Sequence, residues 1–159
     1  MNLDPRTIMF MNFVSSFIIS IGLLNVSRGY LSQIRLIKNW AFVTFIQALA
    51  WIMIGLRNVI PDIFSIVLAN TLLLMCLALY FNILCKFMDL KVKSYLTFLP
   101  VLASTIFLYY YTFYVPHFGN RVIIISACSM MLMFNSSFIL IYKMAEKQVY
   151  LFTSIVFGI

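Results

Sequence analysis

Long apolar runs without charge, separated by short charged connections, dominate the sequence. Five of these runs are 18 to 23 residues long, and a helix needs about 20 apolar residues to cross the hydrocarbon core of a bilayer. A charge at the centre of such a helix costs about 2.5–3.5 kcal/mol on insertion scales, so the uncharged runs mark the spans. The runs lack the alternation of a barrel strand, so helices are expected. The predicted helices are residues 8–26, 39–56, 63–85, 94–115 and 122–142.

A sixth apolar run begins at Val149 and reaches eleven residues at Ile159. Eleven helical residues rise only about 16 Å, roughly half a bilayer. Residues 149–159 are therefore predicted to be an incomplete helix, either short and re-entrant or continued in a longer protein, and we favour the longer protein. The first run is expected to be a retained helix, because no positive cluster precedes it and no Ala-x-Ala cleavage site follows it.

The composition agrees with a membrane protein and excludes other classes. Apolar residues make up 64% of the chain, charged residues only 9%, and the mean hydropathy is +1.05, whereas a soluble domain carries roughly 25% charged residues. A soluble enzyme, a disordered tail and a disulfide-stapled secreted domain are excluded. The expected fold class is all-α: one polytopic transmembrane helix bundle over residues 1–159, with five complete helices, the start of a sixth, and the lipid bilayer as a partner.

The basic residues orient the chain. Eleven Lys and Arg outnumber four Asp and Glu, but they form no stripe that could follow a phosphate backbone, so no nucleic acid partner is expected. Eight of the eleven lie in the connections on one side, and only Arg6, Arg57 and Arg121 lie on the other. The positive-inside rule then predicts that the N-terminus is outside and that the side with eight basic residues is cytoplasmic.

No catalytic or metal-binding group of residues is recognisable. His117 is the only histidine, and the cysteines Cys76, Cys85 and Cys128 form no Cys-x-x-Cys pair, so neither a triad nor a zinc site is indicated. We expect no cofactor, no metal, no catalytic residue and no enzymatic activity in these 159 residues. Because no span contains an acidic residue, an ion-coupled carrier lacks its usual carboxylate.

Neutral polar residues inside the spans allow two interpretations. The first is that they form hydrogen bonds between helices. The second is that they line a ligand cavity. The spacing of Asp62, Ile66 and Asn70 would place them on one helical face that runs inward from the outer side. A polar groove opening outward would have such a face.

The charged residues of the outer side fall in three short connections and are expected within reach of one another. One interpretation is interfacial anchoring and helix capping, with Asp62 well placed to cap the third helix. The other is an ion-pair cluster that closes a shallow ligand site. The aromatic run Tyr109-Tyr110-Tyr111, followed by Phe113 and Tyr114, is expected to form an interfacial belt, or to roof such a site.

Several short motifs, taken together, resemble the N-terminal membrane region of bacterial GGDEF proteins, the membrane-bound diguanylate cyclases. The motifs are Leu3-Asp4-Pro5-Arg6-Thr7 before the first helix, Gly55-Leu56-Arg57 followed by Ile60-Pro61-Asp62, Ser65-Ile66-Val67-Leu68-Ala69-Asn70 in the third helix, and Arg121-Val122 after the aromatic end of the fourth. Their order and spacing fit across essentially the whole chain.

The resemblance implies a sensory and anchoring input domain in the bacterial inner membrane, acting in signal transduction through cyclic di-GMP. The cyclase output domain is not part of these residues, since the sequence contains no Gly-Gly-Asp/Glu-Glu-Phe. Two copies are expected to pair as a homodimer, because such a cyclase joins two GTP-bound halves. The ligand is an unidentified small molecule or lipid. The candidate sensing or structural residues are Asp4, Arg6, Arg57, Asp62, Asn70 and Arg121.

Two other functions remain open from the sequence. One is a small facilitative carrier or channel component, which a duplicated bundle pattern or a charge within a span would favour. The other is a structural membrane subunit, which would co-purify with a second membrane protein.

Overall fold

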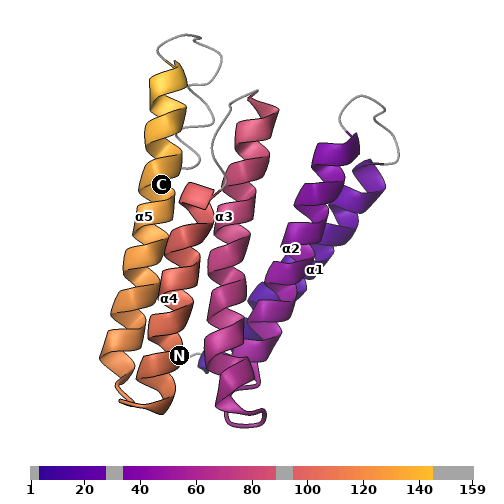
Figure 1. Ribbon diagram of the computed structural model, residues 1–159. Coiled ribbons are helices and arrows are strands. Elements are labelled where there is room, and N and C mark those ends of the chain that lie inside the picture. Colours follow the sequence, from indigo (N-terminus) through magenta and orange to yellow (C-terminus); the bar gives the residue numbers. More distant parts are fainter. Residues whose placement is uncertain (1–3, 28–33, 89–94, 145–159) are drawn as a thin grey trace.

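The computed structural model describes residues 4–27, 34–88 and 95–144, and these residues are almost wholly helical. In chain order the helices are α1 (Pro5–Val26), α2 (Ile34–Gly55), η1 (Ile63–Leu68), α3 (Ala69–Phe87), α4 (Tyr95–Phe113) and α5 (Phe118–Met144) (Figure 1). The element η1 is a short π-helical turn that continues directly into α3. No strand occurs in the described residues, and the prediction of an all-α bundle is confirmed.

Four of the five predicted spans correspond to helices that extend beyond the apolar run at one end or both, although α2 stops at Gly55, one residue before the predicted end. For example, α2 begins at Ile34 instead of residue 39 and takes in Arg35 and Lys38, while α5 begins at Phe118 instead of residue 122. The fifth, predicted for residues 94–115, is shorter in the structure, where α4 ends at Phe113. Long basic side chains near a helix end can reach the headgroup region along their aliphatic stems, so a helix does not have to end where the apolar run ends. The predicted sixth helix, residues 149–159, lies outside the described residues.

Within the described residues, four helical stretches are long and apolar enough to cross a membrane: α1, α2, η1 with α3, and α5. The apolar part of α4, Thr97–Phe113, is shorter. The whole of α4 has 19 residues, which rise about 28 Å, close to the thickness of a hydrocarbon core. It also contains Pro100, which cannot donate a helical hydrogen bond. Length and composition therefore support four membrane crossings directly. When η1 and α3 are counted as one helical stretch, α4 is the shortest of the five stretches in the described residues.

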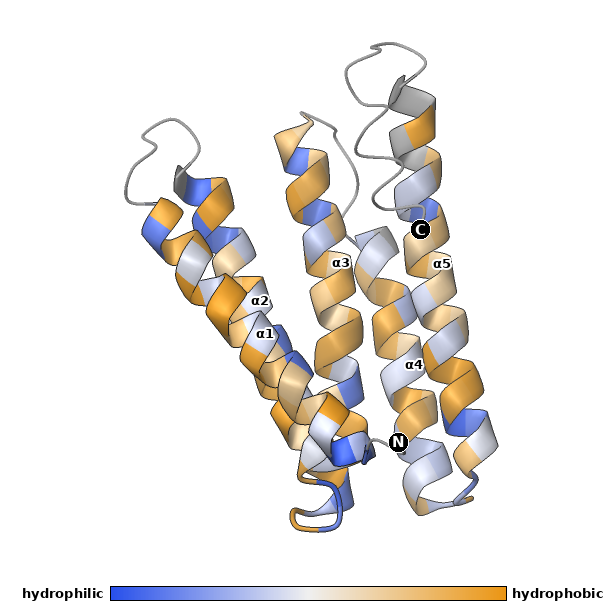
Figure 2. Ribbon diagram, turned by 180° about the vertical axis from the view of Figure 1, so that it is seen from behind, coloured by the Kyte–Doolittle hydropathy of each residue, from blue (hydrophilic) through white to orange (hydrophobic). Residues whose placement is uncertain are grey.

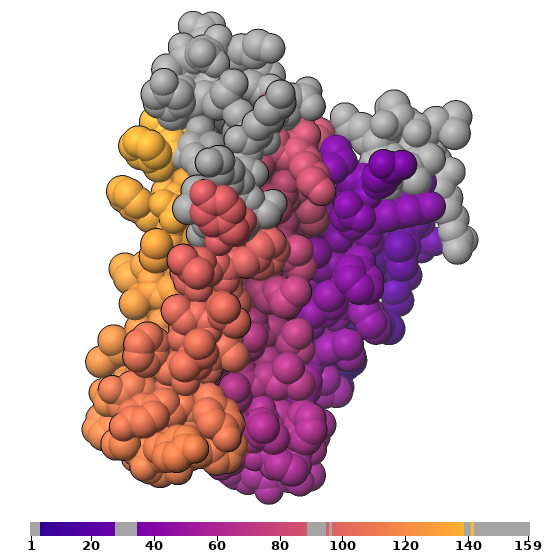
Figure 3. Space-filling model, viewed as in Figure 1, coloured from indigo at the N-terminus to yellow at the C-terminus, as the bar shows by residue number. Residues whose placement is uncertain are grey.

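The helices form two groups. The antiparallel pair α1 and α2 leans away from α3, α4 and α5 at the end where α1 passes into α2 (Figure 1). Among the described helices α1 contacts only α2, and α2 in turn contacts η1 and α3. In the space-filling view α4 covers part of α3, and α3 lies against α2 (Figure 3). The seam between α1 and α2 is therefore the only attachment of α1 to the described bundle.

Small buried residues form the seam between α1 and α2. Ser16 and Ser20 on α1 and Ala41 and Ala48 on α2 are all buried. The Ser20 hydroxyl donates to the Ala41 carbonyl at 2.9 Å. Small side chains let two membrane helices approach closely, and dispersion contacts and such hydrogen bonds then hold them together.

A separate apolar core joins the other three helices. Its buried members are Leu74 and Ala78 of α3, Val101 of α4, and Cys128 and Leu132 of α5. Leu74 is only 1% exposed. This core fixes α4 and α5 against α3, so that the chain holds a two-helix group and a three-helix group that meet along α2 and α3.

Neutral polar side chains bridge neighbouring helices. Between α2 and α3, the Tyr80 hydroxyl donates to Gln47 Oε1 at 2.8 Å and lies 2.9 Å from Thr44 Oγ1. Between α3 and α4, the hydroxyls of Thr71 and Thr105 are 3.1 Å apart. In a membrane each such bond contributes about 0.6–2 kcal/mol. These bonds agree with the first interpretation of the polar residues, that they join helices.

Apolar residues make up most of the length of the helices, and many of the strongly hydrophilic residues lie toward the ends (Figure 2). Many of the apolar side chains are exposed. Examples on three helices are Ile18, Phe42 and Met130, which are 64%, 62% and 73% exposed. So much exposed apolar surface is not found on soluble monomers. The protein is a membrane helix bundle.

Candidate functional site

The charged residues predicted for the outer side lie at one end of the bundle. At this end α1 begins, the connection between α2 and η1 reverses the chain, and α4 passes into α5 (lower end in Figures 1 and 3). Asp4 and Arg6 belong to the first of these segments, Arg57 and Asp62 to the second, and Arg121 to the third. The antiparallel order of the helices places them at a common end, and side-chain packing decides which of them meet.

The connection between α2 and η1 is a compact turn centred on Asn58. Asn58 has a φ of 72°, in the left-handed region that asparagine tolerates better than most residues. The Val59 amide donates to the Leu56 carbonyl at 2.9 Å, and Arg57 and Ile60 form an isolated backbone bridge. This turn fixes Arg57 two residues beyond Gly55, the last residue of α2.

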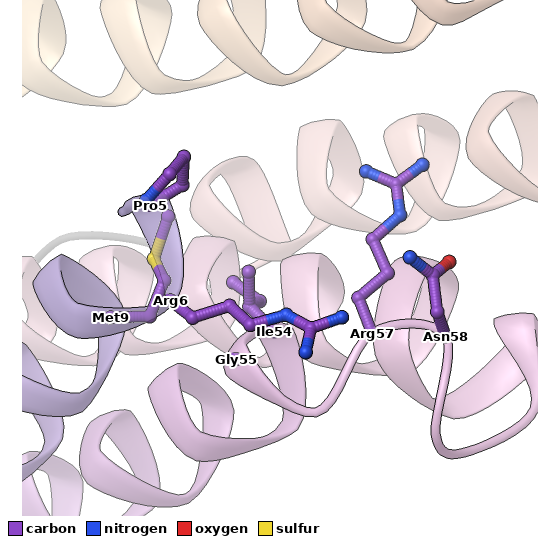
Figure 4. Close-up of a pocket in the computed structure, with 7 residues that line it drawn as sticks. All are labelled: Pro5, Arg6, Met9, Ile54, Gly55, Arg57 and Asn58. Carbon is purple, nitrogen blue, oxygen red and sulfur yellow. The ribbon is translucent and has the colours of Figure 1, made fainter. Parts of the chain in front are cut away.

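Arg6 and Arg57 line a common hollow of about 200 Å³. Figure 4 shows the Arg6 side chain reaching along the end of α2 toward Arg57, while Arg57 and Asn58 project from the turn. We call this the cationic hollow, and its lining residues are Pro5, Arg6, Met9, Ile54, Gly55, Arg57 and Asn58. A Cβ on Gly55 would lie 3.5 Å from the Cβ of Met9, so α1 and α2 are close together beneath it. Two guanidinium groups and no carboxylate line the hollow.

Asp4 caps α1. Its carboxylate accepts from the Arg6 amide at 3.1 Å, and its carbonyl accepts from the Thr7 amide at 2.9 Å. Pro5 occupies the first helical position, where its missing N–H is not needed. Asp4 therefore stabilises the start of α1 and orients the backbone that carries Arg6.

Asp62 does not cap the third helix through its side chain, which corrects the expectation from sequence. Its carboxylate makes no capping hydrogen bond, and its backbone is helical, with φ −59° and ψ −26°. A capping residue usually has an extended backbone that brings its side chain over the next amides. Here the amides of Phe64 and Ser65 already donate to the Pro61 carbonyl, at 3.0 and 3.2 Å. The carboxylate is left exposed because its intended donors are already bonded.

Asn70 makes a side-chain hydrogen bond to the π-helical turn. Its side-chain amide donates to the Ile66 carbonyl at 2.6 Å, while the Ala69 amide reaches back five residues to Phe64. A π-turn holds more residues per turn than an α-helix, so the face expected for Asp62, Ile66 and Asn70 is not continuous. Asp62 is exposed, Ile66 is buried and Asn70 is half-buried.

Arg121 belongs to the start of α5 and does not line the cationic hollow. His117 caps this helix: its Nδ1 accepts from the Asn120 amide at 3.2 Å. Arg121 lies with its guanidinium carbon 6.0 Å from the Phe118 ring centroid, and its buried Nε has no hydrogen-bond partner among the described residues. The capping expected at the outer ends is therefore made by Asp4 and His117.

The ion-pair cluster considered from sequence is not formed. Within the described part of the chain, no ion pair joins Asp4, Arg6, Arg57, Asp62 or Arg121 to another side chain. Of the six candidate residues, the structure brings Arg6 and Arg57 together, places Asp4 next to them as a cap, and leaves Asp62, Asn70 and Arg121 in other surroundings. The arrangement is an unneutralised pair of cations at one end of the bundle.

The tyrosines and phenylalanines at the end of α4 pack on one another at this same end. Tyr110 stacks on Tyr114 with ring centroids 5.8 Å apart, and Tyr109 lies 5.0 Å from Phe113. None of them lines the cationic hollow. The cluster fits the interfacial belt, not a roof over that hollow.

Sequence reasoning missed two features of the surface. Asn58 lines the cationic hollow, and the only signal for it was its position in a short turn before Ile60-Pro61. The second feature is an apolar groove of about 430 Å³ between α3 and α4, lined by Thr71, Met75, Tyr95, Phe98, Leu99, Val101, Leu102 and Thr105. The pattern of apolar residues along the sequence does not predict this groove, because a groove between two helices depends on how the helices pack.

Comparisons with models of known protein families, with curated proteins and with solved structures gave no match to this chain. The fold alone defines the class: an α-helical membrane protein.

Proposed function

We propose that this chain is the membrane-embedded input and anchoring region of a diguanylate cyclase whose GGDEF domain is not among these 159 residues. The observation that supports this most is the meeting of two of the motifs. Pro5 and Arg6 come from the motif before α1, Gly55 and Arg57 come from the motif at the end of α2, and all four line the cationic hollow. Motifs far apart in the sequence that line one hollow have a common structural reason to occur together.

The proposed setting is the bacterial inner membrane, with the cationic hollow on the outer side. The support is the distribution of basic residues: most lie in the connections at the other end, to which Arg35 and Lys38 of α2 belong. Basic residues favour the cytoplasmic side.

The proposed mechanism is a change in helix packing. A cue that binds at the outer end shifts the α1–α2 pair relative to α3, α4 and α5, and so alters the pairing of two cytoplasmic cyclase domains in a homodimer. Such coupling requires that the cue bind one packing arrangement more tightly than the other. The division of the bundle into two groups that meet along α2 and α3 supplies an interface at which this shift would occur.

Arg57→Ala and Asp62→Ala test the signalling role. We expect Arg57→Ala, in the complete protein, to move cellular cyclic di-GMP by about fivefold or more from the wild-type level, the lower end of typical allosteric coupling, because Arg57 lines the cationic hollow. Asp62 does not line the hollow, so Asp62→Ala is expected to have a smaller effect. The Asp62 side chain makes no hydrogen bond or ion pair with described residues, so its removal is not expected to unfold the bundle. The measurement is cyclic di-GMP by mass spectrometry, normalised to membrane abundance.

The matched control is Arg35→Ala, which removes an exposed arginine from the opposite end of α2. Normal abundance with unchanged cyclic di-GMP in both test variants would show that the outer residues have no signalling role.

A further inference from the structure

The cationic hollow carries more positive charge than the described chain neutralises. Arg6 and Arg57 come from different elements and line the same hollow. The nearby Asp4 carboxylate accepts from the Arg6 backbone amide, and neither guanidinium is in an ion pair with a described residue. Figure 4 shows the Arg6 side chain reaching toward the base of Arg57 and the Arg57 side chain extending away from the turn, so two like charges border one hollow. An anion bound in this hollow is attracted by both charges.

We propose that the cationic hollow binds a phosphate group between the guanidinium groups of Arg6 and Arg57. A guanidinium offers a planar fork of N–H donors that matches two oxygens of a phosphate, and two such forks can serve one tetrahedral anion. Asn58 lines the same hollow and supplies a neutral amide. The arrangement therefore offers donors from two elements to one oxyanion.

The side chains, not the start of α1, provide the donors. Pro5 has no N–H, the Arg6 amide is bonded to the Asp4 carboxylate, and the Thr7 amide is bonded to the Asp4 carbonyl. The first amides of α1 are thus occupied. Loss of the two guanidinium groups is expected to remove the phosphate site while leaving the cap of α1 intact.

The surroundings fit a phosphate at the membrane surface. Met9 and Ile54 give the hollow an apolar wall below the two arginines, and the aromatic cluster Tyr109, Tyr110 and Tyr114 lies at the same end of the bundle. The phosphate can belong to a phospholipid headgroup or to a small water-soluble phosphate ester. This inference names the ligand class for the input end, and it rests on the proposed function only for its signalling consequence.

The test is binding to the purified 159-residue chain in a maltoside detergent, which contains no phosphate. One arm titrates glycerol 3-phosphate by calorimetry, and the other counts retained dioleoyl phosphatidylglycerol by native mass spectrometry. Arg6→Gln combined with Arg57→Gln is expected to weaken binding by about tenfold or more, since hydrogen bonds from a guanidinium to a phosphate are about twice as strong as those between neutral groups.

The matched control is Arg35→Gln combined with Lys38→Gln, which removes two positive charges from the opposite end of α2. Its binding is expected to stay within about twofold of wild type. A second test variant, Arg6→Lys combined with Arg57→Lys, keeps both charges but loses the forks. Weakened binding in this variant at an unchanged unfolding midpoint separates recognition from a folding defect.

Binding of phosphatidylglycerol alone would identify a lipid headgroup, and binding of glycerol 3-phosphate would identify a soluble ester; either supports the proposal. Equal losses in the test and control variants, or no binding of either probe to the wild type, would overturn it. Because the assay needs no cyclase, its failure beside a normal cyclic di-GMP response would leave the proposed function standing.

Discussion

Ser20→Leu is expected to separate α1 from α2 and to lower the free energy of unfolding by about 1–3 kcal/mol or more, the usual cost of inserting bulk into a packed interface. Ser20 is 2% exposed, and its hydroxyl lies 2.9 Å from the Ala41 carbonyl. A leucine there cannot fit without moving the helix backbones apart. Its introduction also removes a hydrogen bond of about 0.6–2 kcal/mol. Because α1 contacts only α2 among the described helices, no other interface compensates for the loss.

The measurement is the unfolding midpoint during titration with a denaturing detergent. Ser15→Leu is the matched control, because Ser15 lies on the same helix and is exposed; its midpoint is expected to stay near that of wild type. Equal midpoints for the two variants would mean that the Ser20 seam does not hold α1 against α2.

Leu74→Ala is expected to destabilise the three-helix group by about 2–5 kcal/mol, the range for buried leucines replaced by alanine in protein cores. Leu74 is 1% exposed and belongs to the core shared by α3, α4 and α5. In a membrane, water does not drive helices together, so lost dispersion contacts account for most of the expected effect. Truncation at this position weakens the one buried cluster that joins α3 to both α4 and α5 in the described residues.

The same detergent titration measures this effect. Leu49→Ala on α2 is the matched control, since Leu49 is 42% exposed and its truncation leaves no enclosed cavity. A Leu74→Ala midpoint equal to that of the control would contradict the position of this core.

The helices could be predicted from sequence because charged residues lie near their ends. Arg57 and Asp62 bracket the turn after α2, and Lys86 lies near the end of α3. An uncharged run of sufficient length has few alternatives to a helix in lipid, because every backbone amide must be satisfied internally. The helix ends were less predictable: α2 continues over Lys38 and Arg35, whose long stems let a charged residue sit within a helix near the membrane surface.

That Asp62 does not cap the third helix could not be predicted, because its position before an apolar run is the same whether the first turn is α- or π-helical. The Pro61 carbonyl accepts from the amides of Phe64 and Ser65, and these amides are therefore not available to the Asp62 carboxylate. The hydrogen bond from Asn70 to Ile66 likewise depends on this turn.

The meeting of Arg6 with Arg57 was expected only as proximity within a cluster of five charged residues. Arg6 and Arg57 share a hollow because α1 approaches α2 closely at Gly55. Arg121 does not line this hollow. Small residues along both helices, Ser20 and Ala41 among them, are the sequence signal for that approach.

The central claim, that this chain is the input region of a cyclase, is tested most directly by reading the coding sequence beyond Ile159. The account predicts an open frame that goes on to encode Gly-Gly-Asp/Glu-Glu-Phe. A stop codon directly after Ile159 would contradict it.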